Sequence, residues 1–363
     1  MKKLLWLGLV LVVFAGVALV GCNGAAKDDK FKVGVIYIGE PGDAGWTYAH
    51  DQGFKAAVKA IGEDKVDLVI QQNVKEDQSA TQAMEALINQ GAKAIFATSF
   101  GYMDYIVDLA AKYPDVYFYH CSGYKVADNL STYFGKIEQA RYLTGIVAGS
   151  QTQSNKIGYV AAMPIPEVVR GINGFTLGVR YANPSATVKV IWTNTWYDPQ
   201  VEKDAANALL KDGCDVIAQH QDTAGPQIAA QDQGKWSIGY NSDMSKFAPK
   251  ATLTSAVWHW EVYYEPAIRA AMDGTFASEQ YFEGLNEGIA SYVELNTSLL
   301  KDPSVQGKVD EMEAKIKGGY NIFTGPIKDN TGKMVLEAGK AHTDAELLSM
   351  MYLVEGVIGT IPK

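Results

Sequence analysis

The sequence predicts an α/β protein made of two doubly wound parallel-sheet domains joined by a multi-strand hinge. Short apolar segments alternate with segments of helical apolar spacing along most of the chain. This alternation is typical of a parallel sheet covered by helices on both faces. The pattern starts again after residue 150, and two units of similar size favour two domains over one very wide sheet.

The first unit begins at Lys32 with a near-continuous apolar strand. Its helices each gather apolar residues on one face, as Ala80, Ala83 and Leu87 do in the second helix. The expected strands are 32–36, 66–70, 94–99, 116–119 and 131–137, and the expected helices are 49–61, 79–89 and 104–112.

The second unit follows an apolar helix at 138–150 and repeats the same pattern. The remainder of the chain is too long for a tail and too mixed for a third domain, so we expect it to cross back and complete both units. It contributes strands at 253–257 and 288–293 and a helix at 262–272. The second unit itself has expected strands at 156–160, 188–192, 216–219 and 236–240, and expected helices at 167–181, 202–211 and 226–231.

Domain boundaries follow from this reading. Hinge crossings are expected near Ser150, Ser255 and Tyr292. The N-terminal domain is then 31–149 with about 256–290, and the C-terminal domain is 150–255 with about 291–363. Ligand-binding groups are expected in the cleft where the carboxyl ends of the strands of both domains meet.

The N-terminus has the pattern of a bacterial lipoprotein signal. A basic start at Met1–Lys3 precedes an apolar run, and small residues lead to Cys22. We interpret 1–21 as a signal peptide and 22–30 as a tether, with Cys22 as the lipidated first residue. The alternative is a transmembrane anchor, because about 17 apolar residues approach the lower limit for spanning a bilayer. In either case the body lies outside the cytoplasm.

Charge and cysteine content exclude several classes of partner. The formal net charge is −9, and removal of Lys2 and Lys3 with the signal takes it to −11. A negative chain disfavours nucleic acid and phosphate partners, which need positive fields. Cys121 and Cys214 each follow a strand-like segment, so we interpret them as small buried residues rather than a disulfide or a metal pair.

Known cofactor, metal and nucleophile motifs are missing. The glycines at 39, 42 and 45 have the spacing G-x-x-G-x-x-G, which is neither a dinucleotide fingerprint nor a phosphate loop. The histidines lack zinc-binding spacing, and no G-x-S-x-G elbow occurs. We therefore expect no cofactor, no metal and no enzymatic activity. His120 and His220 do follow strands near carboxylates, which leaves a nucleoside or glycoside hydrolase as an alternative.

Aromatic residues occur at several predicted strand ends. The glycine-rich loop at 37–48 ends in Trp46, while Phe100 and Trp196 follow later strands. A purine or pyrimidine ring can be sandwiched between Trp46 and one of the other two, with roughly 1–3 kcal/mol of stacking energy per base. Trp46 could instead cap the core where its helix starts.

Carboxylates occupy other strand ends, at Glu167, Asp222 and Asp243. Each could accept hydrogen bonds from ring N–H and amino groups of such a ligand. Two of them also have structural explanations. Glu167 lies at a helix N-terminus, where the dipole favours a negative charge, and Asp222 could be an N-cap.

Four segments, together with the signal-like N-terminus, resemble the basic membrane protein family. They are Gly42–Thr47, Thr98–Tyr102, Glu138–Gly145 and Ile238–Asp243. The resemblance covers essentially the whole mature chain. It implies a substrate-binding lipoprotein of an ABC importer with the type I periplasmic-binding-protein fold.

Within that family, nucleoside receptors stack a base on an aromatic residue of the first loop. By resemblance, Trp46 and Thr47 take the stacking and base-contacting positions, and Asp243 falls near the acidic ribose contact. Tyr37 replaces an aspartate of those receptors, so a ribose contact is lost and a bulkier stacking ring is gained. The resemblance therefore points to the purine-base branch and implies base contacts from Trp46, Glu167 and Asp222.

The expected function is that of a monomeric, lipid-anchored receptor outside the cytoplasm. We expect it to bind a purine base or nucleoside, with an adenine-like base favoured, and to pass it to an ABC permease. It would contact the membrane through its lipid anchor alone and would not bind nucleic acid. Besides the hydrolase, the alternatives are binding of a sugar or another small polar ligand, and a sensory role without transport.

Overall fold

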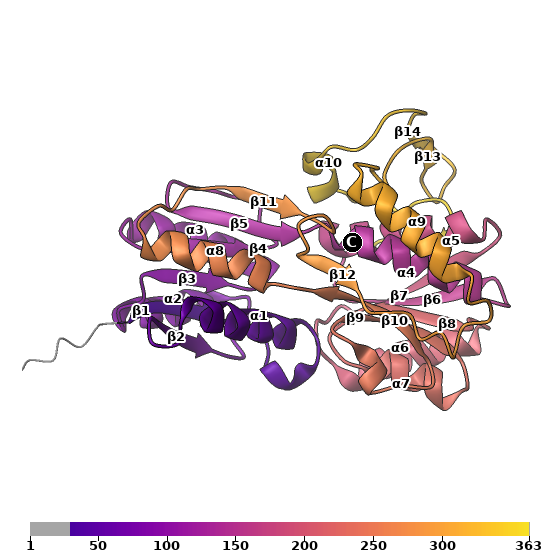
Figure 1. Cartoon of the computed structure of the whole chain (residues 1–363), viewed down its shortest axis with the longest axis horizontal. Coiled ribbons are helices and arrows are strands. Elements are labelled where there is room, and N and C mark those ends of the chain that lie inside the picture. The colour runs from indigo at the N-terminus through magenta and orange to yellow at the C-terminus, as the bar shows by residue number, and fades with distance from the viewer. Residues whose placement is uncertain (1–29, 363) are drawn as a thin grey trace, which may run out of the picture.

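A computed structural model describes residues 30–362 of the chain. It has two α/β lobes, which lie left and right in Figure 1. The proposed signal peptide, its lipidation site Cys22 and nearly all of the tether fall outside the described residues. No helix within 30–362 is long and apolar enough to cross a membrane.

The N-terminal lobe is a six-stranded parallel sheet in the order β11-β5-β4-β3-β1-β2. Helices α1 and α8 pack together, as do α2 and α3. The aromatic rings of Phe54 and Tyr264 stack at 3.7 Å between ring centroids and anchor α1 to α8. The strands are β1 Phe31–Ile36, β2 Val66–Gln71, β3 Ala94–Ala97, β4 Tyr117–Cys121, β5 Leu130–Gly135 and β11 Gln280–Glu283, and the helices are α1 Trp46–Ile61, α2 Gln78–Asn89, α3 Met103–Lys112 and α8 Glu261–Met272.

The C-terminal lobe is a seven-stranded sheet in the order β12-β10-β9-β8-β6-β7-β15. Its strands are parallel except that β12 runs antiparallel to β10. Helix α4 packs against α5 and α9, and α6 packs against α7. The strands are β6 Lys156–Ala161, β7 Thr187–Trp192, β8 Val216–His220, β9 Trp236–Asn241, β10 Thr252–Trp258, β12 Ala290–Tyr292 and β15 Val357–Ile358, and the helices are α4 Ile137–Gln151, α5 Pro166–Ala182, α6 Pro199–Lys211, α7 Gly225–Asp232 and α9 Val305–Lys317.

Three segments cross between the lobes. They join β5 to α4, β10 to α8, and β11 to β12. The first crossing lies near Lys136 rather than near Ser150, because α4 packs against α5 and not against the first sheet. Glycines allow this contact, since a Cβ on Gly178 would overlap the backbone of Tyr142. Helical periodicity alone does not indicate which sheet a helix covers.

Short elements complete the described chain. A β-hairpin and a short helix lie beside the C-terminal lobe in Figure 1. The hairpin consists of β13 (Ile327–Lys328) and β14 (Met334–Leu336), and the helix is α10 (Asp344–Leu348). Three 3-10 turns follow strand ends, namely η1 (Pro41–Asp43), η2 (Phe100–Tyr102) and η3 (Met244–Lys246). Together with β11, β15 and α9, these were absent from the sequence prediction, which found only longer periodic segments. Cys121 and Cys214 are buried and unbonded, as predicted.

Candidate functional site

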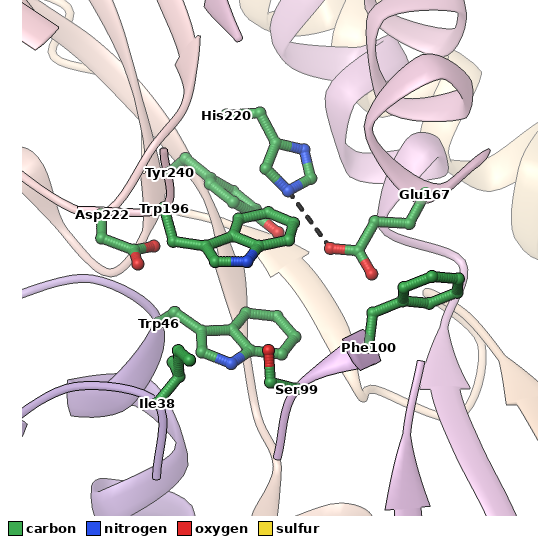
Figure 2. Close-up of a pocket in the computed structure, with 9 residues that line it drawn as sticks. All are labelled: Ile38, Trp46, Ser99, Phe100, Glu167, Trp196, His220, Asp222 and Tyr240. Carbon is green, nitrogen blue, oxygen red and sulfur yellow. Dashed lines mark ion pairs between the residues drawn. The ribbon is translucent and has the colours of Figure 1, made fainter. Parts of the chain in front are cut away.

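A narrow cavity lies between the lobes, at the carboxyl ends of strands from both sheets (Figure 2). Its walls are so close that it has room for about one water molecule. An outer cleft of about 700 Å³ adjoins it. The two lobes are therefore closed on each other in this structure. The lining residues are Ile38, Trp46, Ser99, Phe100, Glu167, Trp196, His220, Asp222 and Tyr240.

Trp46 provides the N-lobe wall of the cavity. Its indole Nε1 donates to the Thr98 carbonyl oxygen at 2.6 Å. The rings of His50 and Trp260 pack edge-on against it, at centroid distances of 4.4 and 5.6 Å. These contacts fix the orientation of the indole, which lines the cavity.

Asp43 sets the start of the helix that carries Trp46. Its carboxylate accepts hydrogen bonds from the backbone N–H groups of Gly45, Thr47 and Tyr48 at 2.8, 2.9 and 2.9 Å. These are donors that the first turn of α1 leaves without helical partners. The glycine-rich loop thus ends in a buried aspartate cap that holds Trp46 in place.

Glu167 lies in the first turn of α5 and is bonded from both lobes. Its Oε1 lies 3.3 Å from His220 Nε2, and its Oε2 accepts a hydrogen bond from Ser122 of the N-terminal lobe. Burial lowers the pKa of His220 to about 4, and the nearby charge of Arg141 acts in the same direction. The imidazole is therefore neutral at physiological pH, and the carboxylate is held by two neutral donors.

Asp222 follows β8 and lies against the opposite lobe. A Cβ on Gly45 would overlap the backbone of Asp222, so these two backbone segments touch without a side chain between them. Asn241 Nδ2 donates to Asp222 Oδ1 at 3.2 Å. Burial raises the pKa of Asp222 well above its usual range, and repulsion from Asp43 raises it further.

Trp196 provides the opposing aromatic wall, from the loop after β7. Its Nε1 donates to Glu76 Oε2 of the other lobe at 3.3 Å. Figure 2 shows the indoles of Trp46 and Trp196 next to each other at the cavity, with Phe100 at one side. The cavity is therefore lined by aromatic rings and by carboxyl groups that come from both lobes.

Five of the seven predicted contacts line the cavity, and two do not. Thr47 is buried in α1, and Asp243 caps η3 by accepting from Ser245 N at 3.0 Å. Tyr37 also lies outside the cavity, fully buried beside Phe54, so it is not the stacking ring that the comparison with nucleoside receptors suggested.

Sequence reasoning did not select Ile38, His220 or Tyr240 as contacts, although all three line the cavity. It also overlooked Ser122, which bonds Glu167 across the lobes. Each of these four residues lies in or just after a strand, and this position is the sequence signal that could have identified them as residues of the site. Within 30–362, no group of three or more histidine, cysteine or acidic residues is placed to hold a metal ion.

Two lobes that close on strand-end side chains are the architecture of ABC-transporter solute-binding proteins. Solved structures share the fold. An ABC transporter solute-binding protein from Aeropyrum pernix has a TM-score of 0.69 at 21% identity, covering 87% of this chain and 97% of that one. One from Conexibacter woesei has a TM-score of 0.64 at 23% identity, covering 80% and 97%.

The chain belongs to the Bmp family, described as ABC transporter substrate-binding protein PnrA-like, which it matches over residues 30–324. It is 44% identical to a purine-binding protein of Brucella abortus, over 98% of this chain and 100% of that protein. It is 36% identical to a putative ABC transporter glucose-binding protein of Haloferax volcanii, over 94% and 84%. The chain is therefore an extracytoplasmic substrate-binding protein, not an enzyme.

Removal of the Asp43 cap should destabilise the protein. Asp43→Ala leaves three N–H groups, two of them buried, without an acceptor, so we expect the free energy of unfolding to fall by about 2–4 kcal/mol, with relief of repulsion at Asp222 offsetting part of the loss. Asp77 is a suitable control, because it caps α2 at the exposed surface through Ser79 N alone. Asp77→Ala should cost about 1 kcal/mol in urea unfolding. Equal losses in the two variants would contradict the assigned role of Asp43.

Proposed function

We propose that this protein, as a monomer, binds a purine base in the cavity between its lobes and delivers it to an ABC permease. An adenine-like base is favoured. The observation that carries the proposal is the pair of indoles, Trp46 and Trp196, which line the cavity from opposite lobes. A planar ring suits such a pair because both of its faces can be covered at once.

Stacking would supply most of the affinity. Each base–aromatic contact contributes roughly 1–3 kcal/mol, and the indole pair offers two such contacts. The cavity is too narrow for a ring in its present form, so the indoles must separate slightly to admit one. Because they belong to different lobes, a small hinge opening is sufficient.

Glu167 would supply selectivity. A carboxylate has about four lone-pair sites, and His220 and Ser122 use two of them. The remaining sites can accept N–H groups from the edge of a base. Ser122 donates to Glu167 from the other lobe, so the same carboxylate would bind the ligand and hold the two lobes together.

A free base fits better than a nucleoside. The closed cavity is small and its lining is mostly aromatic or apolar. Asp243, which the resemblance placed near a ribose contact, caps η3 instead. The 44% identical relative named as purine-binding supports the same class of ligand.

A sugar is the second candidate. The relative named as glucose-binding is 36% identical over most of this chain. Aromatic faces with carboxylates at their edges can also hold a pyranose, through apolar contact and hydroxyl hydrogen bonds. The two candidates differ in the group that faces Glu167. A purine base presents an N–H donor there, whereas a sugar presents a hydroxyl group.

Calorimetric titration of the purified protein distinguishes the candidates. We expect adenine to bind at micromolar affinity or better, one ligand per chain, with light scattering giving a monomeric mass. Guanine, hypoxanthine, adenosine and guanosine should bind more weakly. Glu167→Gln should weaken adenine binding by about tenfold or more, because it replaces one acceptor oxygen with a donor amide. Binding of glucose but of no purine would overturn the proposal.

We also propose that the protein is anchored to the membrane through a lipid on Cys22, with residues 1–21 removed. The basis is the sequence pattern before Cys22. Mass spectrometry of the membrane-bound protein should show a lipid-modified cysteine at the N-terminus. Cys22→Ser should abolish that modification. An intact Met1 on the membrane-bound protein would exclude it.

A further inference from the structure

Three buried carboxyl groups lie near the contact between the lobes, and two of them, Asp43 and Glu202, act electrostatically on the third, Asp222. Asp43 comes from the N-terminal lobe, while Asp222 and Glu202 come from the C-terminal lobe. The contact between Gly45 and the Asp222 backbone brings the two lobes together at this point. Buried carboxylates at short range repel one another, so they cannot all remain ionised without enough donors.

The donors are distributed unequally among the three groups. Asp43 accepts from three backbone N–H groups. Glu202 accepts from Thr223 N at 3.0 Å, Thr223 Oγ1 at 2.6 Å and Asp198 N at 3.0 Å. Asp222 accepts from Asn241 Nδ2 at 3.2 Å, with a further contribution from the Trp46 backbone N–H. Asp222 is therefore the least stabilised anion of the three.

Within the described residues, no lysine, arginine or histidine forms an ion pair with Asp222. Lys75 shares the outer cleft with Asp222, and Arg141 is directed to the Gln219 carbonyl oxygen. Burial, then Asp43 and Glu202, raise the pKa of Asp222, and burial also raises the pKa of Glu202 to about 7. The electrostatic surroundings and the number of hydrogen-bond donors thus both favour Asp222 as the carboxyl group that carries a proton.

We propose that Asp222 is a neutral carboxylic acid in the closed protein and donates its O–H to an unprotonated ring nitrogen of the ligand. This rests on the proposed binding of a purine base. Figure 2 shows Asp222 and Glu167 on opposite sides of the indole pair. Asp222 then donates a hydrogen bond to the ligand on one side of the site, while Glu167 accepts one on the other side.

The arrangement selects a class of ligand. A purine base carries both unprotonated ring nitrogens and N–H groups, so a single neutral base can satisfy the two carboxyl groups. A cation would be recognised by an ionised Asp222 instead. Asp222 is thereby assigned a donor role, whereas the sequence indicated only that it could accept.

The pH dependence of adenine affinity tests the inference. Glu202 of the same lobe raises the pKa of Asp222 even in the open protein, and closure against Asp43 raises it further. Binding therefore takes up a proton between the pKa of Asp222 in the open protein and its higher pKa in the complex. Affinity is then greatest at low pH and falls about tenfold per pH unit across that window. Titrations in two buffers of different ionisation enthalpy should show uptake of about one proton, over the range in which adenine itself stays neutral.

Two variants locate the titrating group. Asp222→Asn keeps an N–H donor in the same place, so we expect adenine affinity to change by a few fold and to lose its pH dependence and proton uptake. Glu202→Gln should retain both. Loss of both in Glu202→Gln, or a flat wild-type profile, would overturn the inference.

A readout without ligand separates this inference from the proposed function. A carboxyl with a raised pKa binds its proton in the folded chain and not in the unfolded one. The free energy of unfolding of the wild type should therefore fall relative to Asp222→Asn as the pH rises from about 5 towards the raised pKa. Parallel curves would overturn the inference, whereas failure of every purine to bind would overturn the proposed function and, with it, the donation to a ring nitrogen, but not the protonation of Asp222.

Discussion

The contact between Gly45 and Asp222 is the constraint on which the site depends. It joins the loop before α1 to the end of β8, and no side chain fits between the two backbones. Ser242 Oγ donates to the Ala44 carbonyl oxygen at 2.6 Å beside it. This contact sets the width of the cavity, because Trp46 follows Gly45 directly. Glycine is required here for close approach rather than for a positive φ.

Closure and recognition use the same groups. Ser122 reaches Glu167, and Trp196 reaches Glu76, each across the lobes. The residues proposed to hold the ligand are thus also those that hold the lobes together. A ligand that completes these contacts stabilises the closed form by its own binding energy. Hinge motion and selectivity therefore depend on one set of hydrogen bonds.

The sequence predicted the fold well because its strands are strongly apolar and its helices are periodic. Trp46, Glu167 and Asp222 were placed at the cavity by the rule that ligands bind at strand ends. The rule could not separate Asp243, which caps a turn, from these residues. Nor could it find Ser122, because a bond between lobes depends on the closure angle, which no local pattern encodes.

Calorimetric titration of adenine into a matched pair of glycine variants tests most directly whether lobe closure at this contact creates the site. Gly45→Ala places a Cβ against the Asp222 backbone, whereas Gly42→Ala in the same loop meets no atom within 4 Å. We expect Gly45→Ala to weaken adenine binding by about tenfold or more, since overpacking costs about 1–3 kcal/mol, and Gly42→Ala to bind like the wild type. Equal affinity in the two variants would contradict the account.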